Sequence, residues 1–336
     1  MGREQAARLE RPAVTPLRLV RSFFRRSDAS AIIATAVLFT AFSTLTANFF
    51  TPFNQFNVWR AASQNVFIAL GQAMVVVIGG MNLSLGAIGA LTVVVVGHSI
   101  EILGLAPWIA VLLGLAAGML CGIFNGFFIS RFKLNSFVVT LATSFIFQGL
   151  VNGISQGRPY SKIPKEFTIL GKGDLLGIPN MVFLMLAALV VVFFVFRYTV
   201  VGRRLLATGG NAEAARLSGI KTGRMIMLAN VASGFCGSVA AVLWVSRMGT
   251  AQPATGGDWL IVSFAVTVIG GTALSGGTIS ALGFLFSGLL MALIRNGLIM
   301  LGVNVYFEAT FLGFIILLAV MVEYFRMNVA GRAKGM

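Results

Sequence analysis

Long runs of apolar residues alternate with short polar segments along the whole chain. The runs are about twenty residues long, the length of an α-helix that crosses a bilayer. They lack the every-second-residue alternation of membrane β-barrel strands. They predict an all-α polytopic membrane protein with about ten transmembrane helices, near residues 29–47, 61–79, 83–103, 107–130, 135–154, 180–197, 225–246, 258–274, 279–301 and 307–325.

The composition agrees with a membrane location. Of the 336 residues, 57% are hydrophobic and only 10% are charged. A soluble domain needs roughly 25% charged residues, so a soluble fold is excluded.

The net charge of +15 is distributed unevenly over the predicted topology. With a cytoplasmic N-terminus, 18 of the 25 Lys and Arg residues lie on the cytoplasmic side: Arg3, Arg8, Arg11, Arg18, Arg21, Arg25, Arg26, Arg131, Lys133, Arg197, Arg203, Arg204, Arg216, Lys221, Arg224, Arg326, Arg332 and Lys334. Cytoplasmic loops of membrane proteins are enriched in such residues. The pattern therefore explains the basicity without a nucleic acid partner, and it predicts a membrane protein with both termini in the cytoplasm.

This topology divides the chain into three parts. Residues 1–28 form a basic cytoplasmic tail, residues 29–325 form the transmembrane domain, and residues 326–336 form a second cytoplasmic tail. Within the transmembrane domain, the two polar loops of interest are the cytoplasmic loop 198–224 and the periplasmic loop 155–179.

An internal repeat relates the two halves of the chain. The segments 75–86 and 266–277 both fit V-x-V-I-G-G-x-x-L-S-x-G, and Asn125-Gly126 is echoed at a different offset by Asn296-Gly297. Diverged repeats are typical of membrane transporters. In a membrane protein, a glycine pair can break a helix beside a water-filled path, or it can let two helices pack closely. The sequence pattern leaves both interpretations open.

Polar side chains inside the predicted spans are the candidates for a translocation path. They are Gln72, Asn82, Ser84, Asn125, Gln148, Asn152, Arg295 and Asn296. Amides and hydroxyls suit a neutral hydroxyl-rich solute, because they exchange hydrogen bonds without trapping it by charge. The alternative for each residue is a hydrogen bond between helices. For Arg295 it is an ion pair with Glu308.

Signatures of catalysis are absent from the sequence. There is no G-x-x-x-x-G-K-[ST] loop, so we expect no ATP binding by a P-loop on this chain. One His, two separated Cys and scattered acids provide no metal-site spacing and no catalytic triad. We therefore expect a non-enzymatic protein without a cofactor or metal of its own.

The segment 209–220, GGNAEAARLSGI, predicts a short helix exposed to the cytoplasm. Asn211 suits the N-cap and Gly219 the left-handed position after the helix. Glu213 and Arg216 complement the helix dipole and each other. Isolated helices this short are unstable in water, so the segment predicts docking onto a soluble partner, with Ala212 and Ala215 as a small-residue face.

These residues also carry a family resemblance. Glu213-Ala214-Ala215 with Gly219 is similar to the E-A-A-x-x-x-G core of the cytoplasmic loop in ABC importer permeases, although the I-x-L-P tail is missing. The chain resembles the ribose-type monosaccharide permeases of the branched-chain amino acid and ribose permease superfamily over about residues 30 to 325. The matching segments are 79–84, 202–203, 209–211, 215–220, 251–253, 270–274, 296–298 and 301–303. Asn82 replaces the Asp of the usual G-G-x-D-L-S element.

The resemblance implies a permease subunit that forms the path for a monosaccharide. A second copy or a paralogue would complete the path, and a periplasmic solute-binding protein would deliver the sugar, touching the 155–179 loop. A cytoplasmic ATPase would bind ATP and grip Gly209, Gly210, Asn211, Glu213, Ala214, Ala215, Arg216 and Gly219. The alternatives are a non-sugar solute on the same scaffold, such as a nucleoside, polyol or furanone, a stand-alone secondary transporter, or an intramembrane enzyme.

Overall fold

A computed structural model describes residues 28–304 together with residues 307, 310, 311, 313, 314, 317 and 321. Residues 1–27, Glu308, most of the predicted span 307–325 and the C-terminal tail lie outside the described residues.

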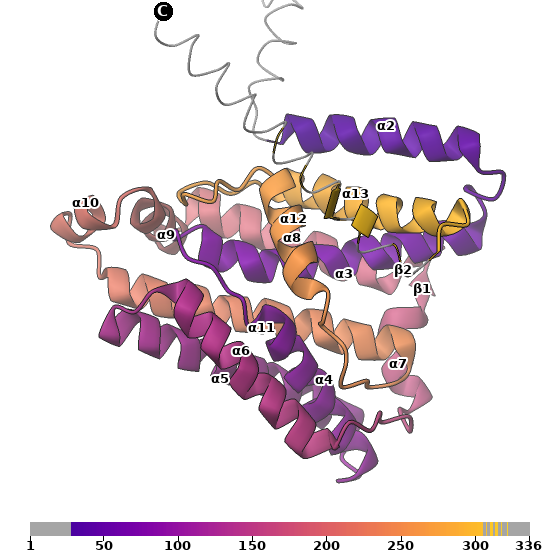
Figure 1. Cartoon of the computed structure of the whole chain (residues 1–336), viewed down its shortest axis with the longest axis horizontal. Coiled ribbons are helices and arrows are strands. Elements are labelled where there is room, and N and C mark those ends of the chain that lie inside the picture. The colour runs from indigo at the N-terminus through magenta and orange to yellow at the C-terminus, as the bar shows by residue number, and fades with distance from the viewer. Residues whose placement is uncertain are drawn as a thin grey trace, which may run out of the picture.

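The described chain is helical and confirms the predicted all-α fold (Figure 1). The helices are α2 (Ala29–Leu45), α3 (Pro52–Val76), α4 (Leu85–Glu101), α5 (Pro107–Phe132), α6 (Ser136–Ser155), α7 (Lys165–Lys172), α8 (Asn180–Tyr198), α9 (Val200–Gly210), α10 (Ala212–Leu217), α11 (Thr222–Met248), α12 (Trp259–Ile269) and α13 (Ala281–Met300). Within the described part, α5, α6, α8, α11 and α13 are long and apolar enough to cross a membrane, and α2, α4 and α12 are shorter apolar helices. The only strands there, β1 (Asp174–Leu175) and β2 (Ile178–Pro179), form a small antiparallel hairpin.

Two helices differ in length from the prediction. α3 begins at Pro52 instead of residue 61, because the hydroxyl of Thr51 caps it by accepting from the Asn54 amide and the fixed φ of proline suits the first helical position. α12 ends at Ile269 instead of residue 274, because the chain turns at Gly271, whose φ is 82°.

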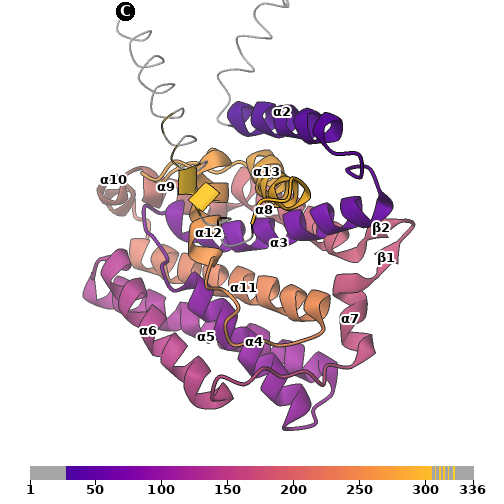
Figure 2. The ribbon, with the colours of Figure 1, turned by 45° about the vertical axis from the view of Figure 1, so that its right-hand side comes forward.

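The centre of the bundle is α11, which packs against α5, α3, α4, α7 and α9. Figure 2 shows α2 along one edge beside α13, and α6 on the opposite side near α4 and α5. The apolar core includes Leu85, Ile88, Leu243, Phe284 and Leu293, all fully buried. The helix α10 lies at one end of the bundle, whereas α7 and the β1–β2 hairpin lie at the other (Figure 1).

A glycine stripe brings α5 and α11 together backbone to backbone. The stripe consists of Gly118, Gly122 and Gly126, one residue per helical turn, whereas Gly114, one turn earlier, packs against Thr92 and Val96 of α4. A Cβ added to Gly122 would overlap the carbonyl oxygen of Asn230 on α11, and one added to Gly118 would lie 2.5 Å from the Cβ of Ser238. Small residues at this spacing allow membrane helices to approach closely.

Both copies of the repeated motif interrupt the helical structure. The first break, residues 77–84, separates α3 from α4, and the second break, residues 270–280, separates α12 from α13. Gly79 in the first break has a φ of 78°, and Gly276 and Gly277 in the second have φ values of 88° and 77°. The helices are therefore broken at both motifs, and the second glycine pair also packs closely, since an added Cβ on Gly283 would overlap the Gly270 carbonyl oxygen. A position of the breaks beside a path stays a prediction.

Candidate functional site

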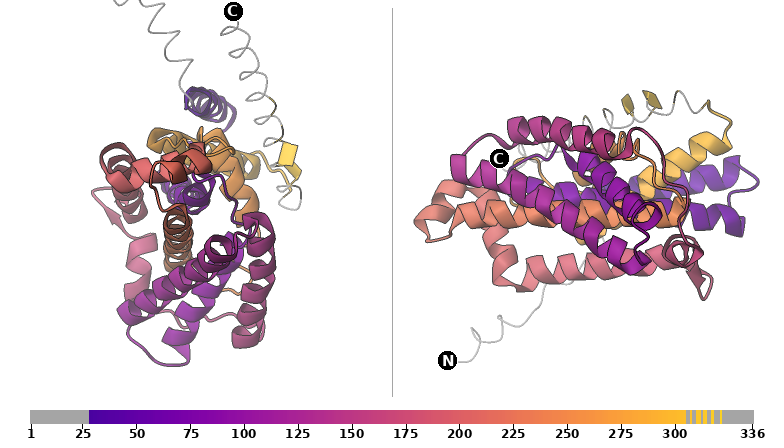
Figure 3. Two further views of the ribbon diagram at one scale, coloured as in Figure 1. Left: turned by 90° about the vertical axis from the view of Figure 1, so that its left-hand side faces the viewer. Right: turned by 90° about the horizontal axis from the view of Figure 1, so that it is seen from below.

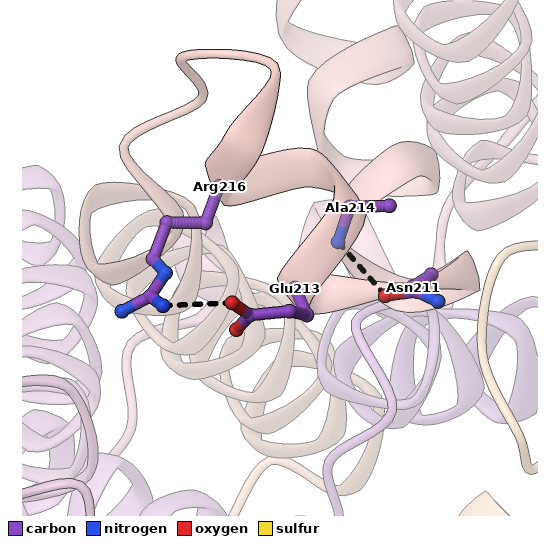
Figure 4. A network of polar contacts seen from close by, with 4 residues as sticks. All are labelled: Asn211, Glu213, Ala214 and Arg216. Atoms are coloured by element: carbon purple, nitrogen blue, oxygen red, sulfur yellow. Dashed lines mark hydrogen bonds and ion pairs between the residues drawn. The ribbon is translucent and has the colours of Figure 1, made fainter.

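The short helix predicted within residues 209–220 is α10, and both predicted caps are present; Figure 4 shows the one at its N-terminus. The Oδ1 atom of Asn211 accepts from the Ala214 amide at 2.9 Å. At the other end Gly219 has a φ of 82°, the Gly219 amide donates to Arg216 O, and the Ile220 amide donates to Ala215 O, both at 3.0 Å. This is the Schellman arrangement that closes helices with a left-handed glycine.

The two faces of α10 differ in exposure. Ala215 is only 5% exposed and faces the protein, whereas Leu217 is 80% exposed. Ala212 is exposed, so the two alanines do not share the single docking face that we expected. Glu213 and Arg216 form an exposed ion pair at 2.7 Å, which contributes little to stability because water screens it. The outward surface therefore consists of an apolar tip and a charged pair.

The helix α9, which precedes α10, contacts both helix breaks. Gly209, in the last turn of α9, packs tightly against both breaks. An added Cβ there would overlap the Val77 carbonyl oxygen and lie 2.7 Å from the Gly277 nitrogen. An added Cβ on Gly276 would lie 2.9 Å from the Gly209 carbonyl oxygen. The left panel of Figure 3 views the bundle from the end that carries α9 and α10. We call Val77, Gly209, Gly276 and Gly277 the glycine junction.

Four predicted path residues come together in a buried hydrogen-bond network. Asn82 Nδ2 donates to Ser233 Oγ at 2.8 Å, its Oδ1 accepts from Ser84 Oγ at 2.7 Å and from Ser84 N at 3.0 Å, and Asn125 Nδ2 donates to Ser84 Oγ at 2.8 Å. In the amide orientation that satisfies both groups, Gln72 bonds the backbone N and O of Asn82. The network holds the first break against α3, α5 and α11.

The other predicted path residues lie elsewhere. Gln148 and Asn152 are on α6, where Gln148 Nε2 donates to Asn152 Oδ1 at 3.4 Å on the surface. Arg295 forms an ion pair with Asp258 at 2.7 Å, and Asn296 Nδ2 donates to Asn54 Oδ1 at 2.6 Å. Glu308, the expected partner of Arg295, is outside the described residues. A transport role for all eight residues stays a prediction.

The loop 155–179 is held against the end of the bundle opposite α10. The Glu101 carboxylate accepts from the amides of Ser161 and Lys162 at 2.7 and 2.9 Å. Tyr160 pairs through its backbone with Ala251, and burial together with the Glu101 charge raises the pKa of its hydroxyl. The loop is therefore an ordered surface that closes this end of the protein.

Sequence reasoning missed several partners of the site. Val77 lies in the repeated motif but has no polar side chain, so only its backbone position shows its role. Ser233 is one of several serines in α11, and no pattern in the sequence distinguishes it. Asp258, an ion-pair partner of Arg295, lies in the polar segment before α12 and was not among the predicted partners.

The paired helix breaks and the exposed short helix belong to an integral membrane protein of the transport class, which comparison with known proteins confirms. Residues 54–320 match the family described as branched-chain amino acid transport system / permease component. The chain is 35% identical over 289 residues to the ribose import permease protein RbsC of Bacillus subtilis (strain 168), covering 85% of this chain and 89% of that protein. No solved structure matches the chain.

Other relatives agree with this match. The ribose import permease protein RbsC of Escherichia coli (strain K12) is 32% identical over 310 residues, with 90% of this chain and 96% of that protein covered. The L-arabinose transport system permease protein AraH of Escherichia coli (strain K12) is 31% identical over 300 residues, with 88% and 90% covered. The chain belongs to this permease family and is a transport subunit of an ABC importer, not an enzyme.

Proposed function

We propose that this permease conducts a monosaccharide related to ribose or arabinose. The observation that carries the proposal is the near full-length similarity to permeases named for these two sugars. The amides of Gln148 and Asn152 on the accessible face of α6 support it, because they are polar groups without charge. Such groups suit a neutral hydroxyl-rich solute.

The partner at α10 is a cytoplasmic ATPase that binds the ATP. Two features support this assignment: the sequence has no P-loop, and α10 presents the 80% exposed Leu217 beside the Glu213–Arg216 pair. An exposed apolar side chain on a capped helix fits a groove on a soluble partner. On this assignment α10 is a coupling helix, and both chain termini face the cytoplasm.

The glycine junction carries motion from the ATPase to the membrane path. Gly209 lies two residues before Asn211, the N-cap of α10, and its backbone packs directly against both helix breaks. A displacement of α10 therefore reaches the breaks through a single turn of α9. Packed elements with two arrangements transmit such displacements, whereas soft connections absorb them.

The path itself lies between this chain and a second permease copy or a paralogue. A periplasmic solute-binding protein delivers the sugar at the opposite end, where the 155–179 loop forms an ordered surface. The predicted path residues Gln148 and Asn152 lie on an exposed face of α6, which leaves them accessible to a second subunit.

The test is reconstitution of the permease in liposomes with the ATPase and the binding protein encoded beside it. We expect ATP-dependent accumulation of D-ribose or L-arabinose. L-leucine is the comparison solute, because the family description names branched-chain amino acids. Accumulation of leucine in place of either sugar would overturn the sugar assignment, and uptake driven by an ion gradient without the ATPase would overturn the ABC mechanism.

A further inference from the structure

A second polar site lies at the end of the bundle opposite α10. It is a cavity of about 180 Å³ between α3, α11, α12 and α13, separate from the network around Asn82. Cavities for drug-sized ligands measure about 300–1,000 Å³, so this one suits a smaller solute. Met248 and Asp258 line it and are exposed, and the cavity therefore opens to the surface.

Gln64 is the most informative residue of this cavity. Its side chain is 3% exposed and lines the cavity, yet the Oε1 atom has no hydrogen-bond partner. A buried acceptor without a partner loses the hydrogen bonds it would make to water, so native proteins rarely leave one unpaired. An oxygen in this position is satisfied when a ligand donates a hydroxyl proton to it.

The polar groups around the cavity favour a ligand that carries both hydroxyl donors and acceptor oxygens. Asp258 is paired with Arg295, so the two charges largely cancel. Arg247 also lines the cavity, and among the described residues its side chain makes no hydrogen bond or ion pair. A guanidinium only donates, while the amide of Gln64 offers both a donor and an acceptor. A hydroxyl group matches both, because it donates and accepts.

The wall of the cavity also supplies aromatic surface. Trp244 at the end of α11 and Trp259 at the start of α12 both line it. The ring of Trp259 is fixed by close contact with α4, where an added Cβ on Gly89 would fall within 3 Å of it. An apolar ring face beside a few placed polar groups is the composition of small-molecule sites.

We infer that this cavity binds one neutral, hydroxyl-rich ring of monosaccharide size, which hydrogen-bonds to Gln64 and Arg247 and lies against Trp244. The inference rests on the proposed function for the identity of the solute as a sugar. It adds a binding step within a single permease chain, at the end where the solute is delivered.

Direct binding tests this site without the delivery protein. The full-length permease with its ATPase is placed in nanodiscs and titrated with D-ribose, L-arabinose and ribitol while tryptophan fluorescence is recorded. We expect a saturable change with at least one of these solutes. Gln64→Leu keeps the side-chain volume and should weaken that binding about fivefold, because one hydrogen bond is lost. Arg247→Gln, which retains a donor amide, should weaken it less than Arg247→Leu.

Two control variants keep the result interpretable. Gln55→Leu removes an amide from the same helix, where Gln55 donates to Phe49 O away from the cavity, and Trp108→Phe removes an exposed tryptophan from α5. Both should bind the solute as the unmodified protein does. Thermal unfolding of each variant shows that the fold is retained.

The outcomes separate this inference from the proposed function. If no solute gives a saturable change, or if Gln64→Leu and Arg247→Leu bind as tightly as the unmodified protein, the cavity is not a binding site, even where the complete transporter imports sugar. If ribitol alone binds in a Gln64-dependent manner and neither sugar is imported, the site stands and the sugar assignment falls.

Discussion

The backbone amide of Gly277 donates a hydrogen bond of 2.9 Å to the carbonyl oxygen of Val77. The two residues belong to the two copies of the repeated motif, so this bond ties the break before α13 to the break after α3. Gly209 of α9 lies against the same pair of residues. The two breaks therefore share one contact with the segment that leads to α10, and we expect them to respond to it together.

The glycine junction predicts a specific coupling defect. Gly209→Ala would push α9 away from Val77 and Gly277, because the added carbon overlaps backbone atoms that have no side-chain freedom. We expect ATP-driven uptake to fall about tenfold, equivalent to roughly 1.4 kcal/mol of coupling, while the ATPase still binds. Gly223→Ala is the matched control, since its nearest neighbour would be 3.9 Å away. Equal uptake by the two variants would contradict a role for the junction.

The exposed tip of α10 predicts where the ATPase binds. Leu217→Asp would place a charge where an apolar side chain is buried by the partner, and we expect a loss of about 2 kcal/mol, or roughly thirtyfold in Kd. Titration of the purified ATPase against the permease in nanodiscs measures this. Leu176→Asp changes a leucine at the opposite end that is also highly exposed and should leave the Kd unchanged. A similar loss in both variants would argue against docking at α10.

The glycine stripe predicts opposite effects for two similar substitutions. Gly122→Ala should lower the free energy of unfolding by about 1–3 kcal/mol, because the methyl group overlaps the backbone of α11. Gly149→Ala on α6 meets no atom within 4 Å and gains about 1 kcal/mol of helix propensity. Thermal unfolding in detergent compares the two. A stabilising Gly122→Ala would show that α5 and α11 are not in backbone contact.

The buried network predicts which substitutions of Asn82 the fold tolerates. Asn82→Leu removes the acceptor of the Ser84 amide and the donor to Ser233, and should cost about 1–3 kcal/mol for each group left unpaired. Asn82→Asp keeps the acceptor, and a carboxyl at this buried position is held in its neutral acid form, which can also donate to Ser233, so the cost should be smaller. Chemical denaturation of the two variants measures the order, and the reverse order would contradict this network.

Much of the fold was predictable because apolar runs of about twenty residues identify membrane helices in a sequence. The predicted spans 107–130, 135–154 and 180–197 agree closely with α5, α6 and α8. The caps of α10 were also predictable, since Asn211 and Gly219 act through local backbone geometry. The burial of Ala215 was not predictable, because it depends on how α10 packs against the rest of the protein.

The assembly of the site was harder to predict than its members. Gln72, Asn82, Ser84 and Asn125 were all identified as polar residues in spans, but their meeting in one network depends on the path of a non-helical segment through the bundle. Helical periodicity does not describe such a segment. The pairing of Arg295 with Asp258 has the same origin, since Asp258 precedes α12 at a turn whose position no spacing rule sets.

The glycine stripe on α5 also limits how the protein can work. Because α5 and α11 touch through their backbones at Gly122 and Asn230, neither helix can roll about its own axis without a collision. The helices α5 and α11 therefore behave as one rigid unit. We therefore expect any change between inward and outward access to tilt these two helices as one unit, with the flexing in the segments 77–84 and 270–280, which are not helical.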